Sequence, residues 1–250
     1  MSDPAATGYP PGSTGSANAF AATRRDLQRL ATHVLARARA GHGGRFGLRV
    51  TPSGLGTPAF GPDDTVLRLA GANLVVERQS ADGRTAASRP LVGATLADAA
   101  AFAGVDLDEP FAPGNDAPPV GDRGAPLALD PASVDIILGW YRVGAQALDG
   151  VLPTLDHPTA AQVWPEHFDI GLSATTPTGG VNLGASPGDA GVAEPYLYVA
   201  PWTGHRPGDP DFWNAPYGAV VTRSVLAASD DPGPAAVAFL TRGVDLLSAG

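Results

Sequence analysis

Cysteine and lysine are both missing from this chain of 250 residues. Without cysteine there is no thiol nucleophile, no disulfide and no thiolate metal site. All sixteen basic residues are arginine, which excludes a Schiff-base lysine, the lysine of a P-loop and the lysine of an S-x-x-K serine enzyme. The composition therefore excludes covalent mechanisms that use a cysteine thiol or a lysine amine.

Positive charge is also scarce, since the net charge is −9 at pH 7. A negative chain is repelled by phosphate backbones, so nucleic acid is not an expected partner. The first twenty residues have no basic start and no apolar run, and no stretch approaches the ~20 apolar residues of a membrane span. We therefore expect a soluble, cytoplasmic protein without a membrane partner.

What the chain does contain is typical of a folded body with many turns. Hydrophobic residues make up 44% and charged residues 16%, a globular composition. The 32 glycines and 25 prolines are spread between apolar runs. The length suits one large hydrophobic core or two modest ones.

Periodicity predicts four regions: a flexible arm at 1–18, a helix–strands–helix half at 19–104, a Pro/Asp/Gly-rich connection at 105–129, and a second such half at 130–250. In the first half we expect helices at 19–40 and 95–104, the second capped by Thr95, and strands at 45–51, 65–70, 73–79 and 84–90, with an Asp82-Gly83 hairpin. In the second half, helices follow Asp130-Pro131 and Asp231-Pro232, and strands lie near 162–174, 180–185, 195–200 and 217–225.

The expected fold class is therefore α+β, with antiparallel sheets flanked by helices. The repeated order of elements is consistent with a pseudo-twofold duplication. An ordinary α+β chain whose halves look alike by chance is the alternative.

Two short motifs imitate known sites. Gly184-Ala185-Ser186-Pro187-Gly188 matches the G-x-S-x-G of a nucleophile elbow, but Pro187 lacks the backbone N–H that the oxyanion hole needs. Gly54-Leu55-Gly56 resembles the start of a dinucleotide-binding fingerprint, but the helix that should follow it is missing from the pattern. We interpret the first as a turn between strands and dismiss the second as a nucleotide site.

Strand alternation gives the most informative pattern, because alternate side chains of a strand share a face. In each of the three strands near 162–174, 180–185 and 195–200 the apolar residues fall on one side. If the strands share a sheet, its other face gathers polar and aromatic side chains: His167, Asp169, Asn182, Ser186, Tyr196, Tyr198 and Trp202. Tyrosine and tryptophan combine apolar area with a hydrogen-bonding tip, which suits ligand sites and interfaces.

Five stretches also carry a resemblance: VWPEHFDIGL, NLGASPGD, EPYLYVAPW, FWNAPYGAVV and the closing DPGPAAVAFLTRGVDLL. Between about residues 20 and 247 the chain resembles an uncharacterised, mainly actinobacterial family of proteins with a domain of unknown function. The resemblance implies no activity, cofactor or site residue.

Three functions follow from the polar and aromatic face. The first is a small-molecule pocket with aromatic walls and polar groups: Trp164, Tyr196, Tyr198, Trp202, Trp213, His167, Asp169, Asn182, Ser186 and Asn214. The second is a metal-dependent hydrolase using His167 and Asp169, with His157, Glu166 or His205 joining from loops and zinc or manganese as the ion. The third is a homodimeric module that buries this face against a second copy. The alternative to all three is that these side chains only pack the fold.

Overall fold

A computed structural model describes residues 17–81, 83–114 and 116–249. It contains two five-stranded antiparallel sheets together with helices, so the α+β prediction is confirmed. The predicted arm at 1–18 lies almost entirely outside the described residues, and so does Asp82 of the predicted hairpin.

The chain divides into two compact units. What we call the N-terminal unit comprises Thr14–Arg142 with Gln162–Ile170. The C-terminal unit contains Val143–Ala161 and Gly171–Gly250. Both α4 (Pro131–Val151) and β7 (Asp169–Thr176) run from one unit into the other.

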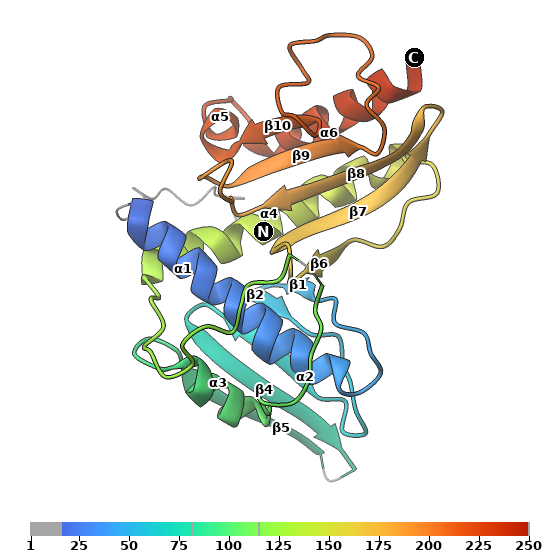
Figure 1. Cartoon of the computed structure of the whole chain (residues 1–250). Helices are drawn as coiled ribbons and strands as arrows, with labels where there is room; N and C mark the ends of the chain where they lie inside the picture. The colour runs from blue at the N-terminus through green and yellow to red at the C-terminus, as the bar shows by residue number, and fades with distance from the viewer. Residues whose placement is uncertain (1–16, 82, 115, 250) are drawn as a thin grey trace, which may run out of the picture. The chain divides into compact units, whose positions relative to one another are not determined.

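The N-terminal unit is built on a sheet whose strands are in chain order. They are β1 (Arg49–Thr51), β2 (Gly54–Gly56), β3 (Val66–Ala70), β4 (Asn73–Ser80) and β5 (Gly83–Pro90). One face is apolar because Leu67 and Leu69 of β3 lie beside Val76 and Leu74 of β4, all of them buried. This face is covered by helical residues (Figure 1).

The covering helix is continuous but changes its winding. It consists of α1 (Ala17–Leu30), a π-helical segment η1 (Ala31–Ala36) and α2 (Arg37–Ala40). All six residues of the π-helical segment are buried. Beside it lies α3 (Leu96–Ala103), which Thr95 caps as predicted, forming a capping box with Asp98.

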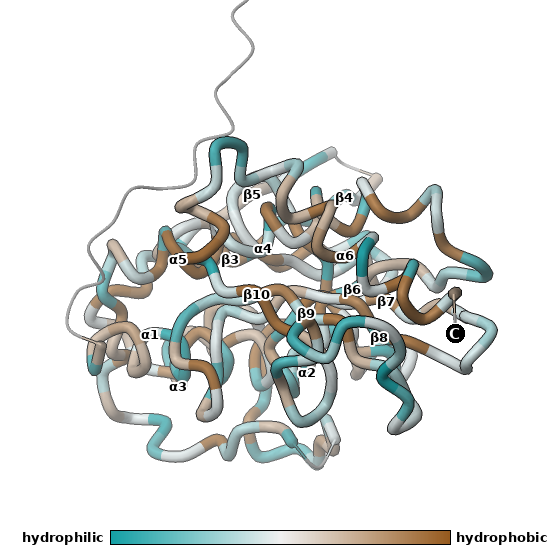
Figure 2. Tube along the Cα trace, turned by 90° about the horizontal axis from the view of Figure 1, so that it is seen from above, coloured by the Kyte–Doolittle hydropathy of each residue, from teal (hydrophilic) through white to brown (hydrophobic). Residues whose placement is uncertain are grey.

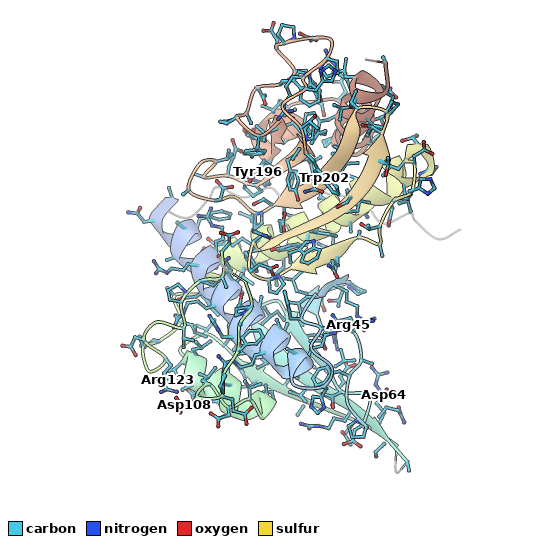
Figure 3. The ribbon with its side chains drawn as sticks, turned by 45° about the vertical axis from the view of Figure 1, so that its right-hand side comes forward. Arg45, Asp64, Asp108, Arg123, Tyr196 and Trp202 are labelled. Atoms are coloured by element: carbon cyan, nitrogen blue, oxygen red, sulfur yellow. The ribbon has the colours of Figure 1, made fainter. Side chains whose placement is uncertain are left out.

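The 105–129 connection is hydrogen-bonded to side chains of the first helix. Arg29 donates to the carbonyls of Val120 (2.6 and 2.9 Å) and Asp122 (2.8 Å). His33 bonds the Pro118 carbonyl at 2.7 Å. Within the connection, Arg123 and Asp108 form an ion pair (Figure 3).

Further side chains of the first helix continue this pattern at both ends of the connection. Arg37 donates to the carbonyls of Asp106 and Glu109. At the other end, Asp26 accepts from the Ala128 N–H at 2.7 Å, and Thr23 donates to the Ala128 carbonyl. The segment thus obtains from side chains the hydrogen bonds that a strand would obtain from its neighbours.

The second sheet has the order β10-β9-β8-β7-β6. Besides β7, its strands are β6 (Gln162–Trp164), β8 (Gly179–Ser186), β9 (Tyr196–Pro201) and β10 (Ala219–Thr222). In the C-terminal unit α6 (Pro232–Ala249) packs on β9, where a Cβ at Gly243 would lie 2.7 Å from Val199. The short segments η2 (Leu152–Thr154) and α5 (Arg223–Ala227) complete the chain.

Most predicted elements are confirmed, and three need correction. The single strand expected at 162–174 is two strands, because a turn at 165–168 separates β6 from β7. The strand expected at 45–51 is regular only from Arg49, and the one at 217–225 ends at Thr222, where α5 begins. Gly54-Leu55-Gly56 forms β2, which the sequence reading missed.

Both sheets are meanders in chain order, each preceded by a long helix. The duplication itself stays a prediction. Among the described residues, no helix is both long and apolar enough to cross a membrane.

Replacing Arg29 with alanine tests whether the helix holds the connection. We expect the free energy of unfolding in urea to fall by roughly 1.5–3 kcal/mol, because hydrogen bonds from a charged donor to the backbone carbonyls of Val120 and Asp122 are lost. Amide exchange should accelerate near Val120 and Asp122. Arg25→Ala, an exposed position on the same helix, is the control and should change stability by less than about 0.5 kcal/mol. Equal losses in the two variants would contradict the account.

Candidate functional site

The pairing of β8 with β9 confirms the predicted alternation. Asn182 lies opposite Ala200, Gly184 opposite Tyr198, and Ser186 opposite Tyr196. We call this side the aromatic face and define it by eight residues: Gly180, Asn182, Gly184, Ser186, Tyr196, Tyr198, Ala200 and Trp202. The intervening residues Val181, Leu183, Leu197 and Val199 are fully buried. Figure 2 shows brown, hydrophobic stretches of the tube beside the labels β10 and β9.

Trp202 is the most exposed large hydrophobic side chain of this face, with 66% of its surface accessible. Its indole lies directly over Gly180, because a Cβ at Gly180 would fall 2.3 Å from the ring atom Cε3. Its Nε1 donates to Asn182 Oδ1 at 2.8 Å, and its backbone N–H donates to the Gly180 carbonyl. The ring is thus held at the surface by a hydrogen bond to Asn182 and by packing on Gly180, which has no side chain.

Asn182 is itself held in place from the next strand. Ser173 of β7 donates its Oγ proton to the same Asn182 Oδ1 at 2.8 Å. An indole N–H can only donate, so the amide oxygen must face Trp202. The Asn182 Nδ2 group is consequently turned away from both partners and can donate to a ligand.

Tyr198 lies across the sheet in a similar way. It sits opposite Gly184, and a Cβ at Gly171 of β7 would lie 2.9 Å from its hydroxyl oxygen. Glycine on neighbouring strands therefore gives the ring room to lie on the sheet, an arrangement known as aromatic rescue of glycine. Figure 3 labels Trp202 and Tyr196, which mark the two ends of the aromatic face along β9.

At the other end the aromatic face is closed by the loop after β8. Tyr196 is buried and donates its hydroxyl to Asp189 Oδ2 at 2.5 Å. Asp189 Oδ1 accepts from the backbone N–H groups of Gly191 and Val192, which fixes the loop. Burial first, and then the bond to Asp189, raise the pKa of Tyr196 far above its usual range. Tyr196 is therefore a protonated structural donor at neutral pH.

Ser186 ends β8 and is buried with Tyr196. Its Oγ accepts from the Gly188 N–H at 3.1 Å, within the turn that leads into the loop. A loop and not a helix follows Ser186. The environment is that of a turn, as the proline at 187 indicates.

Trp213 and Asn214 have partners that orient them elsewhere. The Nε1 of Trp213 donates to the Pro207 carbonyl, and its ring packs edge-on against Phe212, which in turn contacts Phe239 of α6. Asn214 exchanges two hydrogen bonds with the backbone of Val220 on β10. His205 is exposed on the same loop.

The remaining predicted residues, His167, Asp169 and Trp164, belong to the N-terminal unit. His167 does not share a strand face with Asp169, contrary to the prediction, because it lies in the turn at 165–168 and not on a strand. Its half-exposed ring has Nδ1 3.7 Å from Asp116 Oδ2. Trp164 is the last residue of β6, 37% exposed, and Asp169 is the first residue of β7.

The turn that carries His167 is tightly fixed. Phe168 adopts a left-handed φ of 56°, and its carbonyl accepts from the buried Tyr141 hydroxyl at 2.7 Å. Gln28 and Thr32 of the first helix donate to the carbonyls of Glu166 and Pro165. A positive φ in a bulky residue is uncommon, and it ends the alternation that the sequence reading extended through this segment.

Two further titratable side chains, Glu166 and His33, are buried. Glu166 is only 8% exposed, and its Oε2 has no hydrogen-bond partner among the described residues. Burial raises the pKa of Glu166. His33 is 4% exposed, and burial lowers its pKa despite the bond to Pro118. His33 lies in the π-helical segment, and sequence periodicity does not reveal that winding.

The predicted metal candidates do not form a ligand cluster. Over residues 17–81, 83–114 and 116–249, no group of three or more His, Asp or Glu side chains is placed to hold a metal ion. The metal-dependent hydrolase therefore stays a hypothesis without a described ligand set.

No family model, no curated protein and no solved structure matches this chain. The resemblance to an actinobacterial family stays a prediction, and function has to be argued from the geometry alone.

Glu166→Gln tests the buried carboxylate through its pH dependence. Because the folded state raises the pKa of Glu166, folding binds this proton more tightly than the unfolded chain does, and stability is lost as pH rises through that range. The glutamine variant should therefore be more stable than the parent at pH 7, by about 1 kcal/mol. At pH 4, below the ordinary value of 4.5, this advantage should shrink.

Urea unfolding at both pH values measures the effect. Glu109→Gln, whose side chain is exposed, is the matched control and should show no such dependence. A Glu166→Gln variant that is less stable than the parent at pH 7 would show that the carboxylate is satisfied in the folded protein.

Proposed function

We propose that this chain is a binding protein whose aromatic face holds a neutral, hydroxyl-bearing ring, of the kind found in carbohydrates. The observation that carries the proposal is the exposed Trp202 indole, kept flat over Gly180 by the hydrogen bond to Asn182. A ring that is already ordered loses little conformational entropy when a ligand stacks on it. Immobilised aromatic side chains of this kind are typical binding hot spots.

The polar groups around Trp202 favour a ligand that carries hydroxyls. Asn182 Nδ2 is turned away from Trp202 and Ser173, which both bond Oδ1, and the hydroxyls of Ser173 and Tyr198 lie on the same side of the sheet. Ligand sites usually combine an apolar surface with a few such fixed polar groups. A sugar ring offers both an apolar C–H face and a rim of hydroxyls, so its chemistry matches this set.

Charge argues for a neutral ligand. None of the eight residues of the aromatic face is ionisable at neutral pH, and the whole chain carries −9. An anionic ligand would be repelled by the chain and would meet no arginine on this face. A cationic ligand could stack on Trp202, but no carboxylate of the face would pair with it.

A fluorescence titration of the full chain tests the proposal. Neutral cello-, malto- and chito-oligosaccharides are added while tryptophan emission is recorded, and at least one series should change the emission saturably. Trp202→Ala should abolish this change. Asn182→Ala should weaken binding by roughly tenfold, the equivalent of about 1.4 kcal/mol for a lost donor and a loosened ring.

Trp213→Phe is the matched control, because Trp213 is bonded to Pro207 and lies in the cluster with Phe212. This variant should keep the parent's affinity. Oligogalacturonates serve as the charged counterpart and should not bind. The proposal fails if Trp202→Ala responds like the parent, or if only the anionic series binds.

A further inference from the structure

A different surface, the outer edge of β5, shows how two copies of the chain can associate. β5 is an edge strand that pairs with β4 along its full length, from Gly83 opposite Ser80 to Pro90 opposite Asn73. The five residues Arg84–Ser88 are all exposed, which is unusual for a strand because both of its faces are then open. This inference does not depend on the proposed function.

The hydrogen-bonding pattern of the hairpin shows which backbone groups point outward. Antiparallel partners alternate between pairs that bond each other and pairs whose groups point away. Gln79, the partner of Arg84, donates its N–H to Asp63 on the far side of β4. Arg84 therefore belongs to a pair that points away, and so do Ala86 and Ser88. Their N–H and C=O groups face outward, and no other described segment hydrogen-bonds them.

Two other strand edges in the described chain carry hydrogen-bond partners. On β10, which has four residues, the Asn214 side chain bonds both the N–H and the C=O of Val220. At the opposite edge of the first sheet, Leu48 exchanges two backbone hydrogen bonds with Val163 just before β1. Natural edge strands are commonly protected by charged side chains, lysine above all, by proline, by bulges or by short length. β5 has eight residues, and its only proline is the last one.

Charge on β5 is already balanced within the protein. Arg84 pairs with Glu77 at 2.7 Å, and Arg89 pairs with Asp98 at 2.9 Å. The arginine beside them on β3, Arg68, also pairs with Glu77. An acidic partner would therefore meet no arginine on this strand that lacks a carboxylate partner. The uncharged residues between the two arginines, Thr85 to Ser88, favour a neutral strand instead.

A second β5 meets these requirements. With a twofold axis at Ala86, antiparallel pairing places Ala86 opposite its own copy, Thr85 opposite Ala87, and Arg84 opposite Ser88. No two arginines are then directly opposite, and each face of the sheet continues into the next subunit. We propose that two copies of this chain associate through β5, joining their first sheets edge to edge.

Analytical ultracentrifugation of the full chain tests this pairing. The parent should dimerise with rising concentration. Ala86→Glu and Ala86→Arg, each alone, should raise the dimer dissociation constant by at least roughly tenfold, since like charges then meet at the axis. An equimolar mixture of the two variants should restore the dimer, because the opposite charges then face each other.

Val92→Glu is the matched control, since Val92 is exposed just beyond β5, and this variant should dimerise like the parent. Thermal melts of every variant confirm that the fold is kept. A parent that stays monomeric at all concentrations would overturn the proposal. A dimer that survives both Ala86 variants, or that Trp202→Ala disrupts instead, would overturn it as well and place the interface elsewhere.

Discussion

The hydrogen bond from Trp202 Nε1 to Asn182 Oδ1 is the interaction on which the functional account depends. Without it, an indole that is 66% exposed could sample several rotamers and would offer no defined surface. With it, and with Gly180 beneath the ring, the indole becomes a fixed part of the sheet. Ser173 orients the amide from a third strand, so three neighbouring strands determine the position of one side chain.

The aromatic face could be predicted because strand periodicity is a local property. Asn182, Ser186, Tyr196, Tyr198 and Trp202 have the right parity in the sequence, and antiparallel pairing brings them to one side. What the sequence could not show is that the rings of Trp202 and Tyr198 lie over glycines of neighbouring strands. Which residue lies opposite Tyr198 depends on register, and register is set by long-range pairing.

His167 illustrates where the same reasoning fails. Period-two alternation assumes one uninterrupted strand, whereas Phe168 has a positive φ and its carbonyl is held by Tyr141 from α4. The 105–129 connection was recognised by composition, but its attachment was not. Arg29 and His33 reach carbonyls more than eighty positions away in the chain, and such contacts leave no periodic signal. The π-helical turn around His33 is equally invisible to a helical pattern.

The central claim is that a neutral sugar-like ring stacks on Trp202. The most direct test is an NMR titration that follows the indole N–H signals of Trp202 and Trp213 in the same sample, using an oligosaccharide from the series that changes the emission. We expect a progressive, saturable shift of the Trp202 signal, while the signal of Trp213, whose N–H is bonded to Pro207, stays in place. Equal shifts of both signals, or a shift of Trp213 alone, would contradict it.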